Sequence, residues 1–230
     1  MIFEKITQLE QELKGKFEFS AEYNEEIIDY FYESIKENRG IDVTKLFNDV
    51  YSIHDGFNIT IKTGQVILSE VNIVKLFCTF SNTFQERFIQ VYDEWGGEFK
   101  IFTRQFYPLD IYRESLDSVT LTVIKIIDEE HFELWIWNNA GQKYKLKFKS
   151  IEEYLAAGVQ CKFVIFWQYF YIDTDAMDFS DPFTKEWVAF SYSEATSRME
   201  QALTTMKECS PNNNWAGQEK ELERIKKINR

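Results

Sequence analysis

The sequence predicts an α+β protein: a mostly antiparallel central sheet with N-terminal helices, a capped helix after a three-stranded meander, and a C-terminal helical extension. Three observations support this class. Residues 2–13 carry an apolar side chain every three or four positions, which is the period of an amphipathic helix. Residues 118–149 contain runs in which apolar and polar side chains alternate, as in strands with one dry face. Ser150 and Glu153 then form a capping box, which marks the start of a helix.

Two further helices are predicted in the N-terminal quarter. One covers residues 21–38, with apolar positions at helical spacing, Ser20 as a plausible N-cap and Gly40 as the glycine that ends it. The next follows Thr44 and ends before a turn at Asp55–Gly56.

From Phe57 onward the period of the apolar side chains changes to two. Phe57, Ile59 and Ile61 alternate with polar residues, Thr63–Gly64 provides a turn, and Val66–Leu68 begins a second strand. This pattern predicts the first hairpin of the sheet.

The segment between this hairpin and the meander is less regular. Residues 70–80 fit the helical and the strand period equally poorly, whereas residues 84–95 favour a helix. Residues 99–107 favour a strand that Pro108 interrupts or marks as an edge strand, because proline cannot donate to a sheet.

The meander itself is the best specified part of the chain. Strands are predicted over residues 119–127 and 132–137, joined through residues 128–130. The third strand places apolar side chains on one face and four lysines on the other: Tyr144, Leu146 and Phe148 against Lys143, Lys145, Lys147 and Lys149.

The residues after the capping box allow two interpretations. Phe163–Ile172 is aromatic enough for a buried strand, yet apolar side chains step by three or four all the way from Ile151 to Phe170. We therefore expect one long helix, in which Gly158 is tolerated or bends the chain at about 1 kcal/mol relative to alanine.

The C-terminal part begins at the break Asp181–Pro182. Residues 187–192 are expected to form a short edge strand and residues 195–206 an amphipathic helix. We expect one domain over residues 1–209. Residues 210–230 would then be a linker and a charged tail, either an exposed helix or a frayed end.

The net charge of the chain limits the kinds of partner that it can bind. The net charge is −12, and residues 218–230 carry five basic and three acidic side chains, so the tail is +2 and the body −14. An acidic body disfavours direct binding to nucleic acid or anionic membranes and attracts a basic partner, although acidity can also serve only solubility. The three cysteines are widely spaced, and the sequence shows no signal-peptide pattern. No apolar run approaches the roughly 18 residues that a membrane span needs. Together these features predict a cytoplasmic protein.

No motif in the chain identifies a reaction. The two histidines, His54 and His131, each adjoin a carboxylate, so an enzyme of unrecognised type that uses one of them stays open. Patterns of nucleophile elbows, zinc sites and phosphate loops are absent from the sequence. No catalytic residue or cofactor is therefore assigned.

The strongest carboxylate cluster is Asp173, Asp175, Asp178 and Asp181. The first two alternate as calcium ligands do, but the glycine and the bidentate glutamate of a calcium loop are missing, so no metal is assigned. A solvated loop and a partner-facing acidic patch are both compatible with the cluster, and clustered carboxylates would speed association with a basic protein. We take the four aspartates as the candidate partner-binding residues.

Aromatic side chains offer a second kind of surface. Trp135 and Trp137 lie on one side of their strand, an arrangement that can stack bases in single-strand binders. Lysine and arginine are not interleaved with them, so core packing or a dry interface explains them better. An oligomer formed through this face remains a third alternative.

Two segments resemble the SUKH superfamily. Residues 46–57, LFNDVYSIHDGF, are similar to its helix that leads into an Asp–Gly turn and the first strand. Residues 147–155, KFKSIEEYL, are similar to its strand followed by a serine-capped helix. The order and separation of the elements are compatible over much of residues 1–172, and the part beyond Pro182 is not covered.

This resemblance implies an α+β fold and no enzymatic activity. Bacterial members of the family commonly act as immunity proteins that neutralise toxins. The expected function is therefore that of a cytoplasmic protein-binding module that occludes a cognate toxin through an acidic surface. Many nucleases are basic because they hold phosphate, so a nuclease toxin is one suitable partner.

Overall fold

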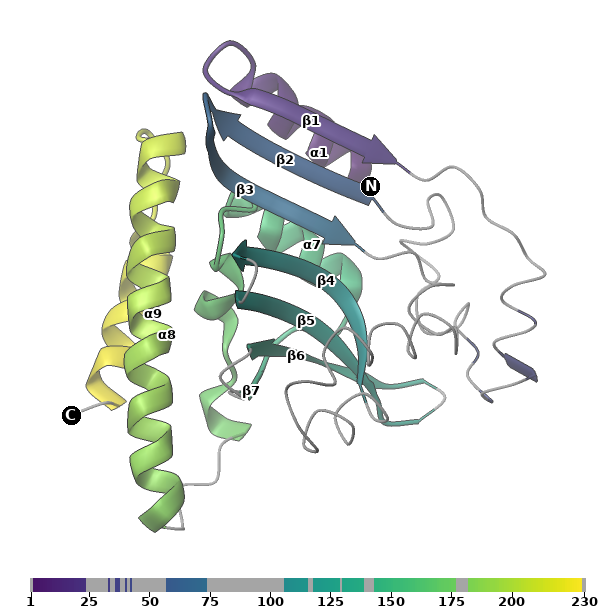
Figure 1. The fold of residues 1–230 in the computed structure, drawn as a ribbon, viewed down its shortest axis with the longest axis vertical. Coiled ribbons are helices and arrows are strands. Elements are labelled where there is room, and N and C mark those ends of the chain that lie inside the picture. Colours follow the sequence, from purple (N-terminus) through teal and green to yellow (C-terminus); the bar gives the residue numbers. More distant parts are fainter. Residues whose placement is uncertain are drawn as a thin grey trace.

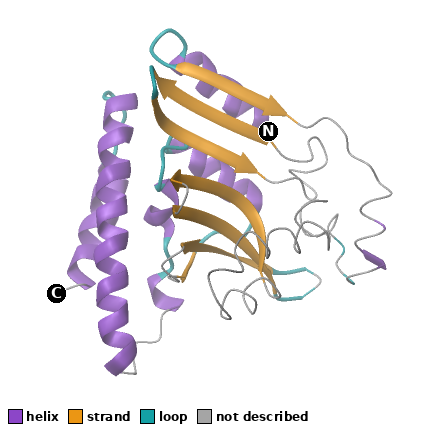
Figure 2. Ribbon diagram, viewed as in Figure 1, coloured by secondary structure: helices purple, strands orange, loops and turns teal. Residues whose placement is uncertain are grey.

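Four helices and seven strands make up the regular structure of the described residues (Figure 2). The structure is a computed structural model, which describes residues 2–23, 33, 36–37, 40, 42, 57–73, 106–115, 118–128, 130–138, 143–176 and 182–228. The helices are α1 (Ile2–Leu13), α7 (Ile151–Gln160), α8 (Pro182–Cys209) and α9 (Ala216–Ile228). This composition confirms the predicted α+β class.

The strands form an antiparallel meander in chain order (Figure 1). They are β1 (Glu18–Tyr23), β2 (Phe57–Thr63), β3 (Val66–Ile73), β4 (Phe106–Ser115), β5 (Ser118–Ile126), β6 (Phe132–Asn138) and β7 (Lys143–Lys145). Among the described residues, Ile73–Asp110 is the one pair that joins β3 and β4 in register. The sheet therefore consists of a three-stranded half and a four-stranded half joined at one point.

The helices cover one face and one end of the sheet. Helices α1 and α7 lie behind it in Figure 1, while α8 passes along the left-hand ends of the strands with α9 beside it. The apolar positions of α1 and the alternating apolar residues of β2 are buried as predicted, at 3% exposure or less: Ile2, Ile6, Leu9, Leu13, Phe57, Ile59 and Ile61. They belong to the main core, which explains why these two periodic patterns were reliable.

The helix predicted over residues 21–38 starts incorrectly. Residues 18–23 form β1, and Ser20 lies in the middle of that strand instead of capping a helix. Pairing with β2 overrides local propensity here, because the half-buried Phe19 and Ala21 then pack against the core. Gly40 has a φ of +67°, and its amide donates to the Lys36 carbonyl at 2.9 Å, as expected of a glycine at a helix end.

Several predictions fall on parts of the chain outside the described residues. These are most of the helix over 21–38, the helix after Thr44, His54, the helix over 84–95 and residues 99–105. Within the described part, β3 extends to Ile73, and β4 runs through Pro108 instead of stopping there. The register with β5 shifts between Pro108 and Asp110, so the proline lies at an irregularity where one missing donor is tolerated.

The capping box is confirmed in detail. The Ser150 hydroxyl accepts the Glu153 amide at 3.1 Å, and the Glu153 carboxylate reaches back to the amide of Lys149 at 2.8 Å. The preceding strand is shorter than predicted, since β7 ends at Lys145. Its alternation nevertheless persists beyond that end, with Tyr144 and Leu146 at most 1% exposed.

The long helix predicted from Ile151 to Phe170 is wrong. Helix α7 ends at Gln160, and residues 162, 163 and 166 have positive φ values. The chain turns so tightly that the Phe163 ring lies over Gly158, where an added Cβ would be 2.1 Å from Phe163 Cε1. Gly158 is therefore a contact site for the returning chain, which then forms a 3₁₀ helix, η2 (Trp167–Tyr171).

The edge strand predicted over residues 187–192 is also wrong, because α8 is continuous from Pro182 to Cys209. Proline at the first helical position needs no amide partner, so it starts the helix that follows it. The predicted apolar stripe of this helix is buried as expected: Ala195, Met199, Ala202, Leu203 and Met206. None of the helices in the described part of the chain is both long and apolar enough to cross a membrane.

The connection between α8 and α9 is fastened to the rest of the molecule. The Ser210 hydroxyl donates to Glu12 on α1 at 3.1 Å, and the same carboxylate accepts the buried Lys162 ammonium at 2.6 Å. The Trp215 indole donates to the Ser210 carbonyl at 3.1 Å. Helix α9 then packs on α8 with Leu222 and Ile225 buried.

Candidate partner-binding surface

The acidic segment predicted as a binding site begins where the chain closes the β7 edge of the sheet. The Lys147 amide donates to the Tyr171 carbonyl at 2.9 Å, and the Asp173 amide donates to the Lys145 carbonyl at 2.7 Å. Leu146 and Ile172 form an antiparallel bridge between these two bonds. The backbone entering the acidic segment is therefore held by sheet-like hydrogen bonds.

Two of the four candidate aspartates lie in the described residues. The Asp173 carboxylate accepts the Asp175 amide at 3.2 Å at the start of a 3₁₀ turn, η3 (Thr174–Ala176). Asp175 is exposed and Asp173 is half-buried, so at least one carboxylate of the turn faces solvent. Asp178 and Asp181 lie outside the described residues. No group of potential metal ligands is found among the residues that the structure describes.

Helix α9 supplies a cation next to this turn. The Arg224 guanidinium donates to the Thr174 hydroxyl at 2.7 Å and, through Nε, to Glu221 at 2.8 Å. Lys147 of the closing segment also donates to Glu221, at 3.1 Å. Hydrogen bonding to Glu221 raises the pKa of Arg224, with a smaller contribution from the charge of Asp175. The basic tail is thus partly an internal counterion of the acidic turn.

Two further cations on and around α9 are paired in a similar way. Lys226 contacts Glu200 at 2.9 Å and Glu223 at 3.2 Å, and Lys207 of α8 contacts Glu219 at 2.7 Å. These pairs are mostly exposed and contribute little stability individually. Their consequence is electrostatic: Arg224 and Lys226 of the tail are paired with nearby carboxylates, and the acidic surplus of the sequence belongs to the body of the molecule.

His131 lies in the turn between β5 and β6. Its ring contacts Asp128 at 2.7 Å, and the same carboxylate accepts the amides of Glu130 and His131, both at 2.9 Å. These hydrogen bonds, first that from the Glu130 amide, lower the pKa of Asp128. The His131 side chain is 71% exposed, and its hydrogen bonds to described residues all involve Asp128. These contacts shape the turn between β5 and β6.

A buried polar cluster was not anticipated from the sequence. The Tyr154 hydroxyl donates to Asp110 at 2.7 Å, lies 3.0 Å from the Thr122 hydroxyl, and accepts the Gln168 amide at 3.2 Å. All four side chains are at most 8% exposed. Burial, and next the charge of Asp110, raise the pKa of Tyr154 well above its usual value. A lone aspartate in the apolar run around Leu109 was the available signal.

This cluster lies where the two halves of the sheet meet. Asp110 is the β4 residue registered with Ile73 of β3, and its partners come from β5, α7 and η2. A satisfied polar network in a core fixes the relative position of the elements that contribute to it. We therefore assign it a structural role in the junction.

The tryptophans of β6 have different surroundings. Trp137 is 5% exposed and is packed inside the molecule, as core packing predicts. Trp135 is half-buried, its indole donates to Glu133 at 3.1 Å, and Lys125 lies 5.9 Å from its ring. The Glu133 carboxylate also accepts Lys145 of β7 at 2.6 Å.

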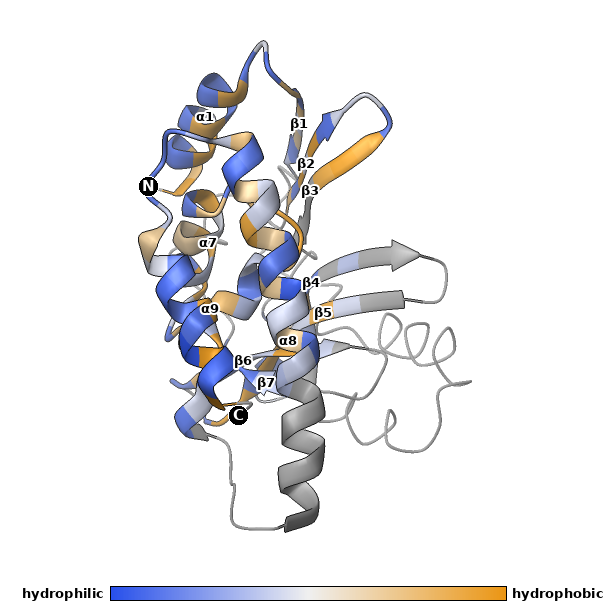
Figure 3. Ribbon diagram, turned by 90° about the vertical axis from the view of Figure 1, so that its left-hand side faces the viewer, coloured by the Kyte–Doolittle hydropathy of each residue, from blue (hydrophilic) through white to orange (hydrophobic). Residues whose placement is uncertain are grey.

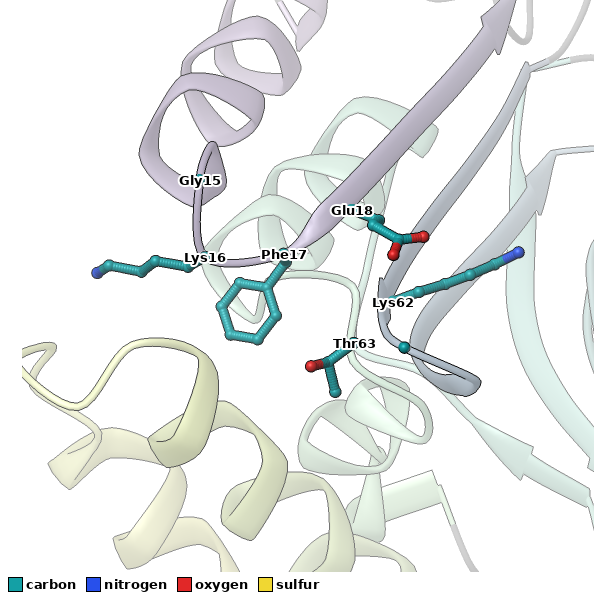
Figure 4. A pocket seen from close by; sticks show the side chains of 7 residues that line it. Gly15, Lys16, Phe17, Glu18, Lys62 and Thr63 are labelled. Carbon is teal, nitrogen blue, oxygen red and sulfur yellow. The ribbon is translucent and has the colours of Figure 1, made fainter.

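A small groove lies at the opposite end of the sheet, between the α1–β1 turn and the β2–β3 hairpin (Figure 4). It has a volume of about 310 Å³ and is lined by residues 15–18 and 62–64. The Phe17 ring and the Thr63 hydroxyl lie toward it, whereas the ammonium groups of Lys16 and Lys62 point away. Val66 and Ile67 are exposed on the same hairpin, at 57% and 42%, and Figure 3 shows β3 as hydrophobic there.

The chain is an α+β protein with a strongly acidic net charge. The polar side chains described above stabilise a turn, form ion pairs, or belong to the buried cluster between the two halves of the sheet. No protein-family model, curated protein or solved structure matches the chain. The assignment of a function therefore depends on the surfaces described above.

Proposed function

We propose that the chain is a non-enzymatic protein-binding module that works as a cytoplasmic immunity protein, related to the SUKH superfamily, and occludes a basic toxin domain such as a nuclease. The observation that carries the proposal is the anchored acidic segment. Its first turn is hydrogen-bonded to β7 and to Arg224, while Asp175 remains exposed. The body of the molecule, which includes this segment, carries a net charge of −14.

Anchoring and charge favour binding through different physical terms. An acidic surface steers a basic partner and raises the association rate, an effect that salt weakens. A backbone that is already ordered loses less conformational entropy on binding, so more of the contact energy is realised as affinity. Inhibition then requires only that the bound module covers the toxin's active site.

Co-expression with the protein encoded by the neighbouring gene tests the proposal. We expect the wild-type chain to form a complex with that protein and to restore growth. Changing Asp173, Asp175, Asp178 and Asp181 together to asparagine should lower the association rate at low salt by about tenfold or more and reduce the salt dependence. Absence of a complex together with undiminished toxicity would refute the proposed function.

A matched pair of variants separates local from global charge. Asp173→Asn/Asp175→Asn and Glu130→Gln/Glu208→Gln each remove two negative charges, and the second pair lies on exposed sites away from the acidic turn. Only the first pair should slow association. Equal effects of both pairs would show that net charge alone is responsible and would refute the acidic turn as the site. The variant His131→Ala should neutralise the toxin normally, whereas a loss of activity would favour the enzyme alternative.

A further inference from the structure

The two edges of the sheet, formed by β1 and β7, differ in how their outer strands are paired. At the β7 end, residues 171–173 hydrogen-bond to the outer strand and its continuation. At the other end, β1 pairs with β2 along all six of its residues, and no other segment of the described chain pairs with it (Figure 1). In an antiparallel pair, alternate residues direct their backbone N–H and C=O groups away from the partner. Such an edge is a template for another strand.

The side chains of β1 define what kind of strand would fit. Glu18, Ser20 and Glu22 are exposed on one face, whereas Phe19 and Ala21 are half-buried on the other face and pack against the core. An added strand would therefore meet carboxylates on its outer face and apolar surface on its inner face. Lysine or arginine alternating with apolar residues satisfies both.

The surroundings make this edge acidic over most of its length. Lys62 of β2 is opposite Glu18, but Glu22 is opposite the uncharged Asn58. Burial raises the pKa of Tyr23, and the negative charge of Glu10 on α1 raises it further. The positive charge available from β2 is thus confined to the beginning of the strand.

Charge also argues against a second copy of this chain as the occupant. A two-fold antiparallel pairing of β1 about Ser20 would place Glu18 of each copy opposite Glu22 of the other. Like charges directly opposite one another destabilise a strand pair. The same two positions become favourable when the added strand carries lysine or arginine there.

We propose that the β1 edge binds an extended basic segment of a partner protein by strand addition, with its Lys or Arg side chains opposite Glu18 and Glu22 and its apolar side chains beside Phe19 and Ala21. The groove lined by residues 15–18 and 62–64 lies at the Glu18 end of this edge and can take a side chain that follows the paired segment. The identity of the natural partner, a basic toxin, rests on the proposed function, whereas the edge itself does not.

A synthetic peptide tests the edge without the natural partner. The probe is a seven-residue peptide that alternates lysine and valine, added to the full chain at low salt. Amide hydrogen exchange should slow at alternate residues within 18–22, because strand addition pairs every second amide. The matched probes are a peptide that alternates glutamate and valine and a lysine–valine peptide with a central proline. Neither should protect these residues.

Charge reversal then identifies the contacting side chains. Glu18→Lys/Glu22→Lys should weaken binding of the lysine–valine peptide by about tenfold or more, since two cross-strand attractions become repulsions. Glu130→Lys/Glu208→Lys changes the net charge equally and should reduce binding at most about twofold. Thermal melts of both variants verify that they are folded. Proline at Ser20 or at Ala21, introduced singly, provides a second test, because one of these two backbone amides points away from β2. The variant that removes the outward amide should have the wild-type melting temperature and should no longer bind the peptide.

The inference is overturned if the lysine–valine peptide leaves residues 18–22 unprotected, or if the proline-containing peptide protects them equally. Equal weakening by the two charge-reversal pairs would also overturn it. The proposed function is judged separately by the neighbouring-gene product. Peptide protection without a toxin complex rejects only the function, and a toxin complex without peptide protection rejects only the strand addition.

Discussion

The two outer strands of the sheet, β1 and β7, meet their surroundings in opposite ways. Strand β7 is short, carries lysines, and is covered by the chain that returns after α7. Cations of this strand and of the segment that continues it are paired within the molecule, since Lys145 contacts Glu133 at 2.6 Å and Lys147 contacts Glu221 at 3.1 Å. Strand β1 is longer and carries glutamates, and the described chain supplies it with a partner on one side only.

The difference shows how one sheet can have one structural edge and one edge suited to binding. Covering an edge satisfies its backbone groups and prevents unwanted pairing, whereas charged side chains on an uncovered edge prevent pairing with most strands. Glutamates on β1 therefore do more than repel other copies, because they select for strands of the opposite charge.

The largest effect is expected where the chain turns to cover β7. Gly158→Ala places a methyl group 2.1 Å from the Phe163 ring position, so the ring and the turn must move. We expect a loss of about 3 kcal/mol in the free energy of unfolding, measured by urea denaturation. The control is Gly217→Ala in α9, where the added methyl has no neighbour within 4 Å apart from the adjacent residues and the backbone of its own helix, and its effect should stay within about 0.5 kcal/mol. Similar free energies of unfolding for both variants would contradict the close contact between Phe163 and Gly158.

The next largest effect concerns the junction between the two halves of the sheet. Tyr154→Phe removes the hydroxyl that donates to Asp110 at 2.7 Å and leaves a buried carboxylate with one donor fewer. We expect a loss of about 2 kcal/mol in unfolding free energy. Tyr171→Phe removes a partly exposed hydroxyl that contacts the Cys161 sulfur at 3.7 Å and Gln218, and it should cost less than about 1 kcal/mol. Equal costs would mean that the cluster does not hold the halves together.

Whether an element could be predicted from the sequence depended on how far along the chain its packing partners lie. Patterns whose packing partner is a neighbouring strand or a continuous helix face were read correctly: α1, the β2–β3 hairpin, β5, β6 and the capping box. In α1 and β2, the period of burial equals the period of the pattern. The errors at residues 18–23 and 187–192 arose because strand pairing or helix continuation overrode short-range propensity.

The covering turn and the buried cluster were beyond a pattern-based prediction for another reason. Steps of three and four from Ile151 to Phe170 do occur, but the Phe163 ring folds back onto Gly158, a contact that no period reveals. Asp110 and Tyr154 are 44 residues apart, and only the fold brings them together. For the candidate site, the sequence supplied Asp173 and Asp175 but not their neighbour Arg224, since α9 was expected to be exposed or frayed.

A pH dependence is expected at the covered edge. Burial raises the pKa of Glu221, but hydrogen bonds from Arg224 and Lys147 lower it more, so the folded-state pKa lies below the ordinary value of 4.5. A lowered folded-state pKa gives stability that is present above pH 4.5 and is lost as the pH falls through the folded-state value. Glu221→Gln should therefore reduce stability at pH 7 and flatten the acid limb of the stability profile. Glu208→Gln, an exposed carboxylate on α8, should leave that limb unchanged, and an identical response of both would contradict the assignment.

The smallest expected effects compare one glutamate at each edge. Glu133 lies beside the covered strand and has three partners, Lys145 at 2.6 Å, the Trp135 indole at 3.1 Å and Lys125 at 3.9 Å. Burial raises its pKa, but hydrogen bonds from Lys145 and Trp135 lower it to a net value below normal, so these contacts favour the ionised carboxylate.

Glu133→Gln should consequently cost about 1 kcal/mol in unfolding free energy at pH 7, an effect expected for a partly buried charge with several partners. Glu18→Gln on the exposed edge should change it by less than about 0.5 kcal/mol. The order of the two effects should reverse when the lysine–valine peptide is bound, because only Glu18 then contacts the added strand. A Glu18→Gln variant that is the less stable of the two without peptide would show that β1 already has an internal partner, and the contrast between the two edges would then not hold.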